Sequence, residues 1–204
     1  MSEHITGGFK RQMKRKKGCM DHSKNTISER EKHIISGQLG REPENALAIV
    51  RRCSAGFPQL LLVHPFRGEN VFPTIYWLSC PELNDRISRL EDRGLLAELT
   101  RREKENGIFG RRMEAAHKNY ARRRRELMCE DDWEGVKALS DDALKTLRHS
   151  GVAGIRTSSG LKCLHAHFAH FMAGGENPAG ERTAALLNRP WLCRRCCSLD
   201  GRLC

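Results

Sequence analysis

The feature that most constrains the fold is the stretch at residues 161–180, which reads LKCLHAHFAHFMAGGENPAG. Its apolar residues recur at spacings of three and four, the period of an α-helix: Leu161, Leu164, Phe168 and Phe171. A pair of glycines ends the pattern. Small alanines border the apolar face and allow another element to approach closely. We therefore expect a short helix at the centre of the fold.

The same stretch places one thiol and three imidazoles within eight residues. At about 100° per residue, Cys163, His167 and His170 fall within about 60° of one another and form one stripe. His165 lies opposite Cys163 on an ideal helical wheel and joins the same site only if the helix begins after it. Because thiolate and neutral imidazole are the usual ligands of zinc, the stretch predicts a metal site, with zinc as the preferred ion. The alternative is a buried structural cysteine with histidines on the helix surface.

Two further thiols stand at the ends of predicted elements. Cys80 precedes Pro81 at a strand-to-helix corner, where a helix N-terminus lowers the pKa of a thiol. We expect Cys80 to be the fourth ligand, with Cys53 as the reserve. The predicted ligand set is Cys53, Cys80, Cys163, His165, His167 and His170. If Cys80 lies far from the helix, His117 and Glu82 become candidate acid–base groups. The sequence itself assigns no catalytic residue and no reaction.

Positive charge is concentrated at the start of the chain. The net charge is +11, and residues 1–30 hold eight basic against three acidic residues. We expect residues 1–27 to be a disordered basic tail that attracts polyanions such as nucleic acid. With the run Arg122–Arg125, this tail supports an alternative function, a nucleic-acid or ribonucleoprotein-binding protein. Aromatic residues make up only 6% of the chain, so stacking platforms are scarce. For the arginine run, a solvated helix face is the favoured interpretation.

The expected cellular location follows from the lack of a membrane span and of a secretory signal. There is no run of 18 apolar residues, so no membrane span is expected. The basic N-terminus lacks the apolar region of a secretory signal, so we expect a cytoplasmic location. In that compartment, the nine cysteines are expected to be thiols or ligands rather than a disulfide framework. Cys193 and Cys196 have metal-ligand spacing within a Cys-rich tail at 191–204, but no second pair follows them.

The remaining pattern predicts an α+β fold. Three short segments rich in aliphatic and aromatic residues, 46–52, 59–64 and 71–78, are separated by Gly- and Pro-containing turns and predict an antiparallel meander. Helices are expected at 28–36, 81–94, 95–105, 109–129, 131–149 (as one or two helices) and 181–187. We therefore expect a single domain at 28–190, in which a small antiparallel sheet of about three strands is covered by several helices.

Several segments, specific in their order and spacing, carry a resemblance to a known family. They include Gln38-Leu39-Gly40-Arg41, FPTIYWLSCP at 72–81, Leu90-Glu91, Ala116-His117 with Tyr120, KCLHAHFAH at 162–170, and Asn177-Pro178 with Gly180. Residues 28–191 thus resemble the bacterial family called domain of unknown function 501. The resemblance implies a small cytoplasmic protein. It implies no activity, because the family is defined without one.

Overall fold

The computed structural model describes residues 27–188 and residue 192. The basic segment at 1–26 and the cysteines after residue 192 lie outside the described residues, so what the sequence predicts for them stays a prediction. The strands are β1 (Ala46–Arg52), β2 (Pro58–Val63), β3 (Phe66–Arg67), β4 (Asn70–Val71) and β5 (Tyr76–Leu78). The helices are α1 (Glu29–Leu39), α2 (Pro81–Asp92), α3 (Leu95–Glu105), α4 (Gly107–Glu126), α5 (Glu130–Leu139), α6 (Asp141–His149), α7 (Leu164–Met172) and α8 (Pro178–Leu187), with a 3-10 turn at Val152–Gly154.

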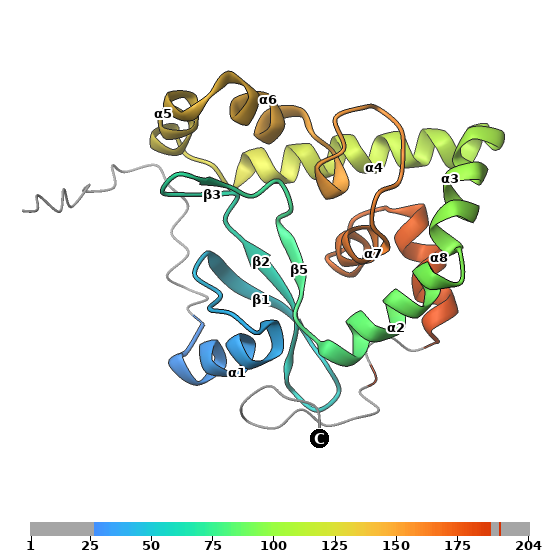
Figure 1. Ribbon diagram of the computed structural model, residues 1–204, viewed down its shortest axis with the longest axis horizontal. Helices are drawn as coiled ribbons and strands as arrows, with labels where there is room; N and C mark the ends of the chain where they lie inside the picture. The colour runs from blue at the N-terminus through green and yellow to red at the C-terminus, as the bar shows by residue number, and fades with distance from the viewer. Residues whose placement is uncertain (1–26, 189–191, 193–204) are drawn as a thin grey trace, which may run out of the picture.

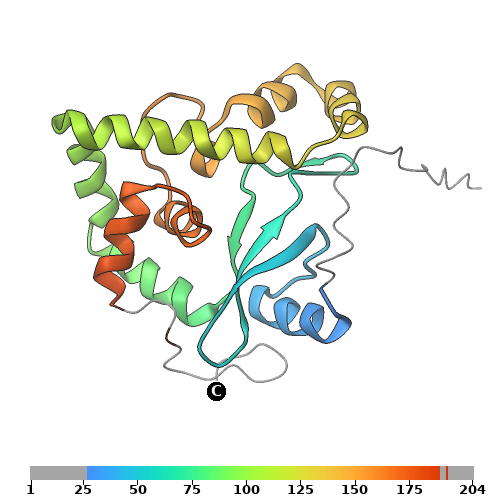
Figure 2. The ribbon, with the colours of Figure 1, turned by 180° about the vertical axis from the view of Figure 1, so that it is seen from behind.

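The main sheet has three antiparallel strands in the order β1-β2-β5, with Leu61 of β2 between Ile49 and Trp77. Successive side chains of β2 point to opposite faces of the sheet, as strand geometry requires. Leu61 packs with Ile35 of α1, whereas Leu60 joins the larger core that the other helices share. Figures 1 and 2 show α1 on one side of the sheet and the helices α2, α3, α4, α7 and α8 on the other. The predicted α+β fold with a small antiparallel sheet is confirmed.

Helix α7 is the innermost element of the helical layer. It packs against β5, α2 and α8, and its His170 ring contacts the Tyr120 ring of α4. Leu164, Phe168 and His167 are fully buried, and His170 is 1% exposed. Polar and apolar faces of the helix are therefore both covered. The central position predicted for this helix is confirmed.

The third predicted strand, 71–78, is divided in two. Its first residue pairs within the β3–β4 hairpin, and β5 begins only at Tyr76. Pro73 lies in the gap and has no N–H to donate to a sheet ladder, so the pairing is interrupted there. The first helix also differs from its predicted end at 36: it continues to Leu39. It ends at Gly40, whose φ of 67° is the left-handed conformation that glycine adopts without strain.

Arg124 of α4 is fully buried, although a solvated face was the favoured interpretation of its run. Its guanidinium donates hydrogen bonds only to backbone carbonyls among the described residues. Nε bonds Leu147 O at 2.8 Å, and Nη1 bonds Pro73 O at 2.7 Å. Nη2 bonds the carbonyls of Thr146 and Ser150. The side chain thus joins α4 to the C-terminal end of α6, where a cation is favourable, and to the segment before β5. Burial lowers the pKa of Arg124 to about 10, so the group stays charged near neutral pH.

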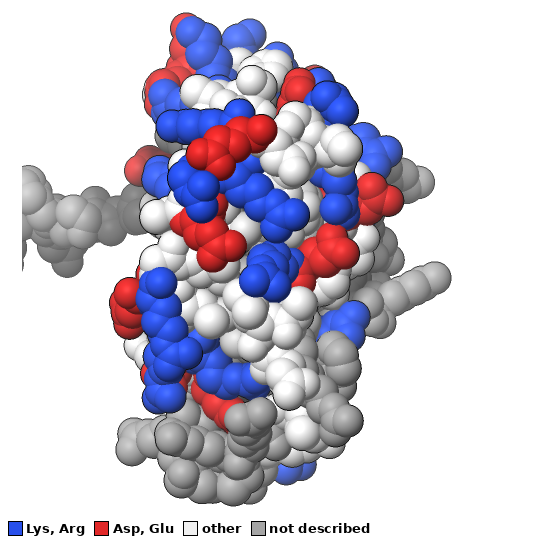
Figure 3. Space-filling view, turned by 90° about the vertical axis from the view of Figure 1, so that its right-hand side faces the viewer, with Lys and Arg blue, Asp and Glu red and all other residues white. Residues whose placement is uncertain are grey.

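The other arginines of the run are already engaged. Arg122 and Arg123 pair with Glu126 on the same helix, and Arg125 donates to the carbonyl of Arg148. Figure 3 shows the same mixing on the neighbouring face, where basic and acidic side chains are interspersed. The predicted contact of the basic segment and of this run with a polyanion stays a prediction.

The structure also bears on the expected lack of a membrane span and on the state of the cysteines. None of the described helices combines the length and apolar character needed to cross a bilayer. Cys53, Cys80 and Cys163 form no disulfide. Cys129 is disulfide-bonded, so the expectation that the cysteines are thiols or ligands does not hold for this residue.

Replacing Arg124 with methionine should lower the free energy of unfolding by about 3 kcal/mol or more, because it leaves buried carbonyls without a donor. Arg122→Met removes an exposed arginine two residues away and should change stability by no more than about 0.5 kcal/mol. Urea denaturation of the two variants beside the wild type measures the difference. Equal small losses would show that the buried guanidinium contributes no net stability.

Candidate metal centre

The start of α7 differs from the helical wheel drawn from the sequence. Cys163 is the residue before the helix and has extended backbone angles, φ −156° and ψ 120°. Leu164 is the first helical residue, and its N–H donates to Oε1 of Glu91 at 2.7 Å. A carboxylate from α2 therefore caps this helix, in place of a local capping side chain. Because Cys163 lies outside the helix, the predicted stripe with His167 and His170 does not form.

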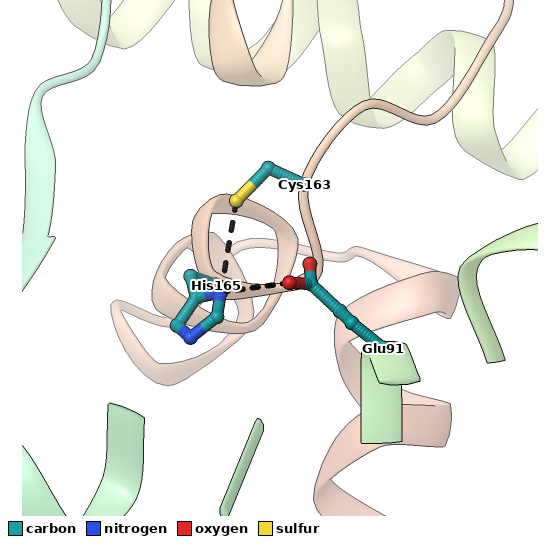
Figure 4. Close-up of side chains that lie close together, drawn as sticks. All are labelled: Glu91, Cys163 and His165. Atoms are coloured by element: carbon teal, nitrogen blue, oxygen red, sulfur yellow. Dashed lines mark hydrogen bonds and ion pairs between the residues drawn. The ribbon is translucent and has the colours of Figure 1, made fainter. Parts of the chain in front are cut away.

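The extended backbone instead brings Cys163 beside His165. Cys163 Sγ lies 3.7 Å from His165 Nδ1, and that nitrogen lies 3.5 Å from Glu91 Oε2. The three donor atoms all lie within 4.8 Å of one another. Figure 4 shows the thiol and the carboxylate approaching the imidazole from different sides. Among the described residues, these three are the group of histidine, cysteine and acidic side chains close enough to share one ion.

The hydrogen bonds of His165 determine which of its nitrogens is available. Nε2 lies 3.1 Å from the carbonyl oxygen of Asn84 and 3.4 Å from the Ser88 hydroxyl. A carbonyl only accepts hydrogen bonds, so Nε2 carries the proton of the neutral ring. The lone pair is then on Nδ1, the atom that faces Cys163 and Glu91. This is the arrangement in which a metal-binding histidine is normally held.

The contacts within the group favour the charged forms of Cys163 and His165. Burial acts to raise the pKa of the Cys163 thiol, but hydrogen bonds from His165 and the Ala166 backbone outweigh it, and the pKa is lowered. Burial acts to lower the pKa of His165, but the contacts with Cys163, Asn84 and Glu91 raise it. Both shifts belong to the ion-free pair of thiolate and imidazolium, in which Nδ1 carries a proton that it donates to the sulfur. The thiolate is the form that binds metals, and an ion would displace this proton to reach the Nδ1 lone pair.

His167 and His170, the two inner histidines, by contrast, both accept hydrogen bonds from the side chain of Asn177. Asn177 caps α8, with its Oδ1 accepting from Gly180 N at 2.9 Å. Its amide nitrogen therefore faces Nδ1 of His167 at 3.1 Å and Nδ1 of His170 at 3.3 Å. Each of the two amide protons meets one imidazole lone pair. Both lone pairs that a metal would need are occupied by donors.

Neighbouring groups complete this inner arrangement. His170 Nε2 donates to Asn119 Oδ1 at 3.2 Å, whereas His167 Nε2 has no hydrogen-bond partner among the described residues. His117 accepts from Val152 N and donates to Gly160 O, so both of its ring nitrogens are engaged. A Cβ at Gly175 would collide with the His170 ring. Burial, followed by the neighbouring histidines, lowers the pKa of His167 to about 3 and that of His170 to about 4.

The structure therefore separates the residues predicted as ligands. It brings Cys163 and His165 together, and it holds His167 and His170 in a different hydrogen-bond network. Cys80 lies at the start of α2 and Cys53 just after β1, both buried, and neither joins a three-residue group among the described residues. Glu82 lies in the first turn of α2 and is not a member of such a group among the described residues.

Glu91 is the site residue that the predicted ligand set lacks. No local spacing connects it to Cys163, because the two lie on segments far apart in the chain. The one signal was its place in the matching segment Leu90-Glu91. Its role becomes visible only when α2 is placed beside the start of α7.

The acid sensitivity of the fold should depend on His170. Its pKa of about 4 lies below the ordinary 6.5, and it faces His117, Tyr120 and Tyr76 in the core. The unfolded chain takes up this proton as pH falls below about 6.5, and the folded chain does not, so stability present above that pH is lost on acidification.

Between pH 7.5 and pH 5.5 the loss from His170 alone should be about 1.4 kcal/mol. Urea titrations at the two pH values should show a smaller drop for His170→Gln than for the wild type. His33→Gln, at an exposed position of α1, serves as the matched control and should keep the wild-type drop. A His170→Gln drop equal to that of the wild type would contradict the assignment.

Comparison with known proteins places this geometry within a family. The family described as "Protein of unknown function (DUF501)" has a model that matches residues 49–185, which is more than half of the chain and includes Glu91, Cys163 and His165. Neither a curated protein nor a solved structure matches the chain. The resemblance noted in the sequence is confirmed: the chain belongs to the DUF501 family of proteins of unknown function.

Proposed function

We propose that this protein binds a transition-metal ion, zinc in the first place, through Glu91, Cys163 and His165. The observation that carries the proposal is the convergence of three different donor atoms within 4.8 Å of one another. A thiolate, an imidazole nitrogen and a carboxylate oxygen are all established zinc ligands. Imidazole suits zinc, iron and copper alike, and the combination of a thiolate, an imidazole and a carboxylate suits zinc.

The separations of the donor atoms support this choice. A tetrahedral zinc ion with bonds of about 2.3 Å to sulfur and about 2.0–2.2 Å to nitrogen and oxygen holds its ligand atoms about 3.4–3.6 Å apart. The sulfur–nitrogen and nitrogen–oxygen separations here are 3.7 and 3.5 Å. The sulfur and the oxygen lie within 4.8 Å of each other and would move closer together as an ion binds.

Second contacts of the same side chains also support the proposal. Glu91 uses Oε1 to cap Leu164, which leaves Oε2 available, and His165 uses Nε2 on Asn84 O, which leaves Nδ1 available. Outer hydrogen bonds of this kind orient ligands and increase metal affinity. Three protein ligands leave a fourth coordination position for water or another molecule. We accordingly propose an open metal site and assign no reaction to it.

Purified protein should bind about one zinc or cobalt ion per chain, measured by elemental analysis after dialysis. Cobalt binding should produce a thiolate-to-metal charge-transfer band. Cys163→Ser, His165→Gln and Glu91→Gln should each weaken binding by about tenfold or more. The Glu91→Gln variant is the most informative, since glutamine retains a carbonyl oxygen to cap Leu164 while it loses the anionic ligand.

Variants at the other predicted ligands decide between the two ligand sets. Cys80→Ala and His170→Gln should bind cobalt with wild-type affinity if Glu91, Cys163 and His165 form the site. Loss of the charge-transfer band in Cys80→Ala, with binding retained in Glu91→Gln, would favour the set predicted from sequence instead. Absence of stoichiometric binding in the folded wild type would overturn the proposal.

A further inference from the structure

Cys163 and His165 also line an open groove of about 640 Å³ between β5 and the start of α7. This volume lies in the range that small-molecule sites occupy. Most of the wall is apolar or aromatic, with Phe72, Pro73 and Trp77 along one side. Ala166 and the start of α7 form the other side. Glu91 does not line the groove, so a bound ion would face it from the side of the thiol and the imidazole.

The charged residues of the groove have one sign. Among the described residues that line it, the ionisable ones besides Cys163, His165 and Tyr76 are Arg41 and Lys162, and none is a carboxylate. Both cations are exposed, and neither has an ion-pair partner among the described residues. The Arg41 guanidinium lies 4.4 Å from the centre of the Trp77 ring. The guanidinium thus lies over one face of the Trp77 ring, so a cation and an aromatic side chain meet in the groove.

We propose that the groove binds a small molecule with a flat apolar body and an acidic group. The body lies against Phe72 and Trp77, and the acidic group is held by Arg41 and Lys162. A ligand in this position covers Cys163 and reaches the fourth position of the metal site. The last step rests on the proposed function, whereas the binding of the ligand in the groove does not require the metal.

A matched pair of fluorescent probes tests the proposal. Anilinonaphthalene sulfonate carries an aromatic body and an acidic group, and N-phenylnaphthylamine is the same ring system without the sulfonate. The first should bind to the folded, zinc-free protein at one site. In Arg41→Gln/Lys162→Gln its affinity should fall about fivefold or more, as expected for the loss of two exposed charge contacts. The affinity of the neutral probe should change by less than about twofold.

Two controls locate the site. Arg101→Gln removes an exposed cation of α3 outside the groove and should leave both affinities unchanged. The sulfonate probe should also protect Cys163 from alkylation by iodoacetamide, measured by peptide mass spectrometry. Circular dichroism confirms that each variant is folded.

The outcomes separate this inference from the metal proposal. Equal binding of the two probes, no effect of the double substitution, or unprotected Cys163 would each overturn the acidic-ligand inference, whatever the zinc measurements show. Charge-dependent, protective binding by a protein that takes up no zinc would support the groove and refute the metal site. If the zinc-loaded protein binds the sulfonate probe more tightly than the zinc-free protein, the probe reaches the ion.

Discussion

The packing of the helices around β5 depends on the buried guanidinium of Arg124. Placing a charge in a protein interior costs several kcal/mol, and here carbonyl dipoles at the end of α6 and at Pro73 offset the cost. One turn earlier on α4, the Tyr120 hydroxyl accepts from Ile75 N at 2.8 Å. Two residues four apart on one helix thus hold the chain that enters β5. Tyr76, which follows, stacks on His170, so the position of α7 is set through the same contacts.

The inner and outer histidines of one short motif meet different partners. His165 meets a carbonyl at Nε2, which leaves the Nδ1 lone pair free beside a thiol and a carboxylate. His167 and His170 meet the amide protons of Asn177, which occupy their lone pairs. An imidazole is a ligand or a structural acceptor according to the group across from it. Its residue type and its spacing are the same in both cases.

The sequence predicts features whose causes are local and misses those that depend on tertiary packing. The helix expected from residue 28, the helix after Pro81 and the strand at 46–52 were predictable, because their causes lie within a few residues. Cys163 and His165 were recognised as candidates, but the helical wheel assumed helical backbone at Cys163. Glu91 and Arg124 act on distant parts of the chain, and Asn177 reaches back across a turn to the preceding helix, so no local pattern indicates which partner they meet. Their roles follow only from tertiary packing.

The cap that Glu91 provides for α7 has a consequence for the unfolded chain. An ion held by Glu91, Cys163 and His165 would join α2 to the start of α7 and close a long loop that contains α3, α4, α5 and α6. Closing such a loop removes conformational entropy from the unfolded ensemble, as a disulfide does, and the effect grows with the logarithm of the loop length. The carboxylate already holds Leu164 without the ion, so the ion would join segments that are in place. The metal would then act as a reversible cross-link that restrains the unfolded chain and reorganises little of the folded one.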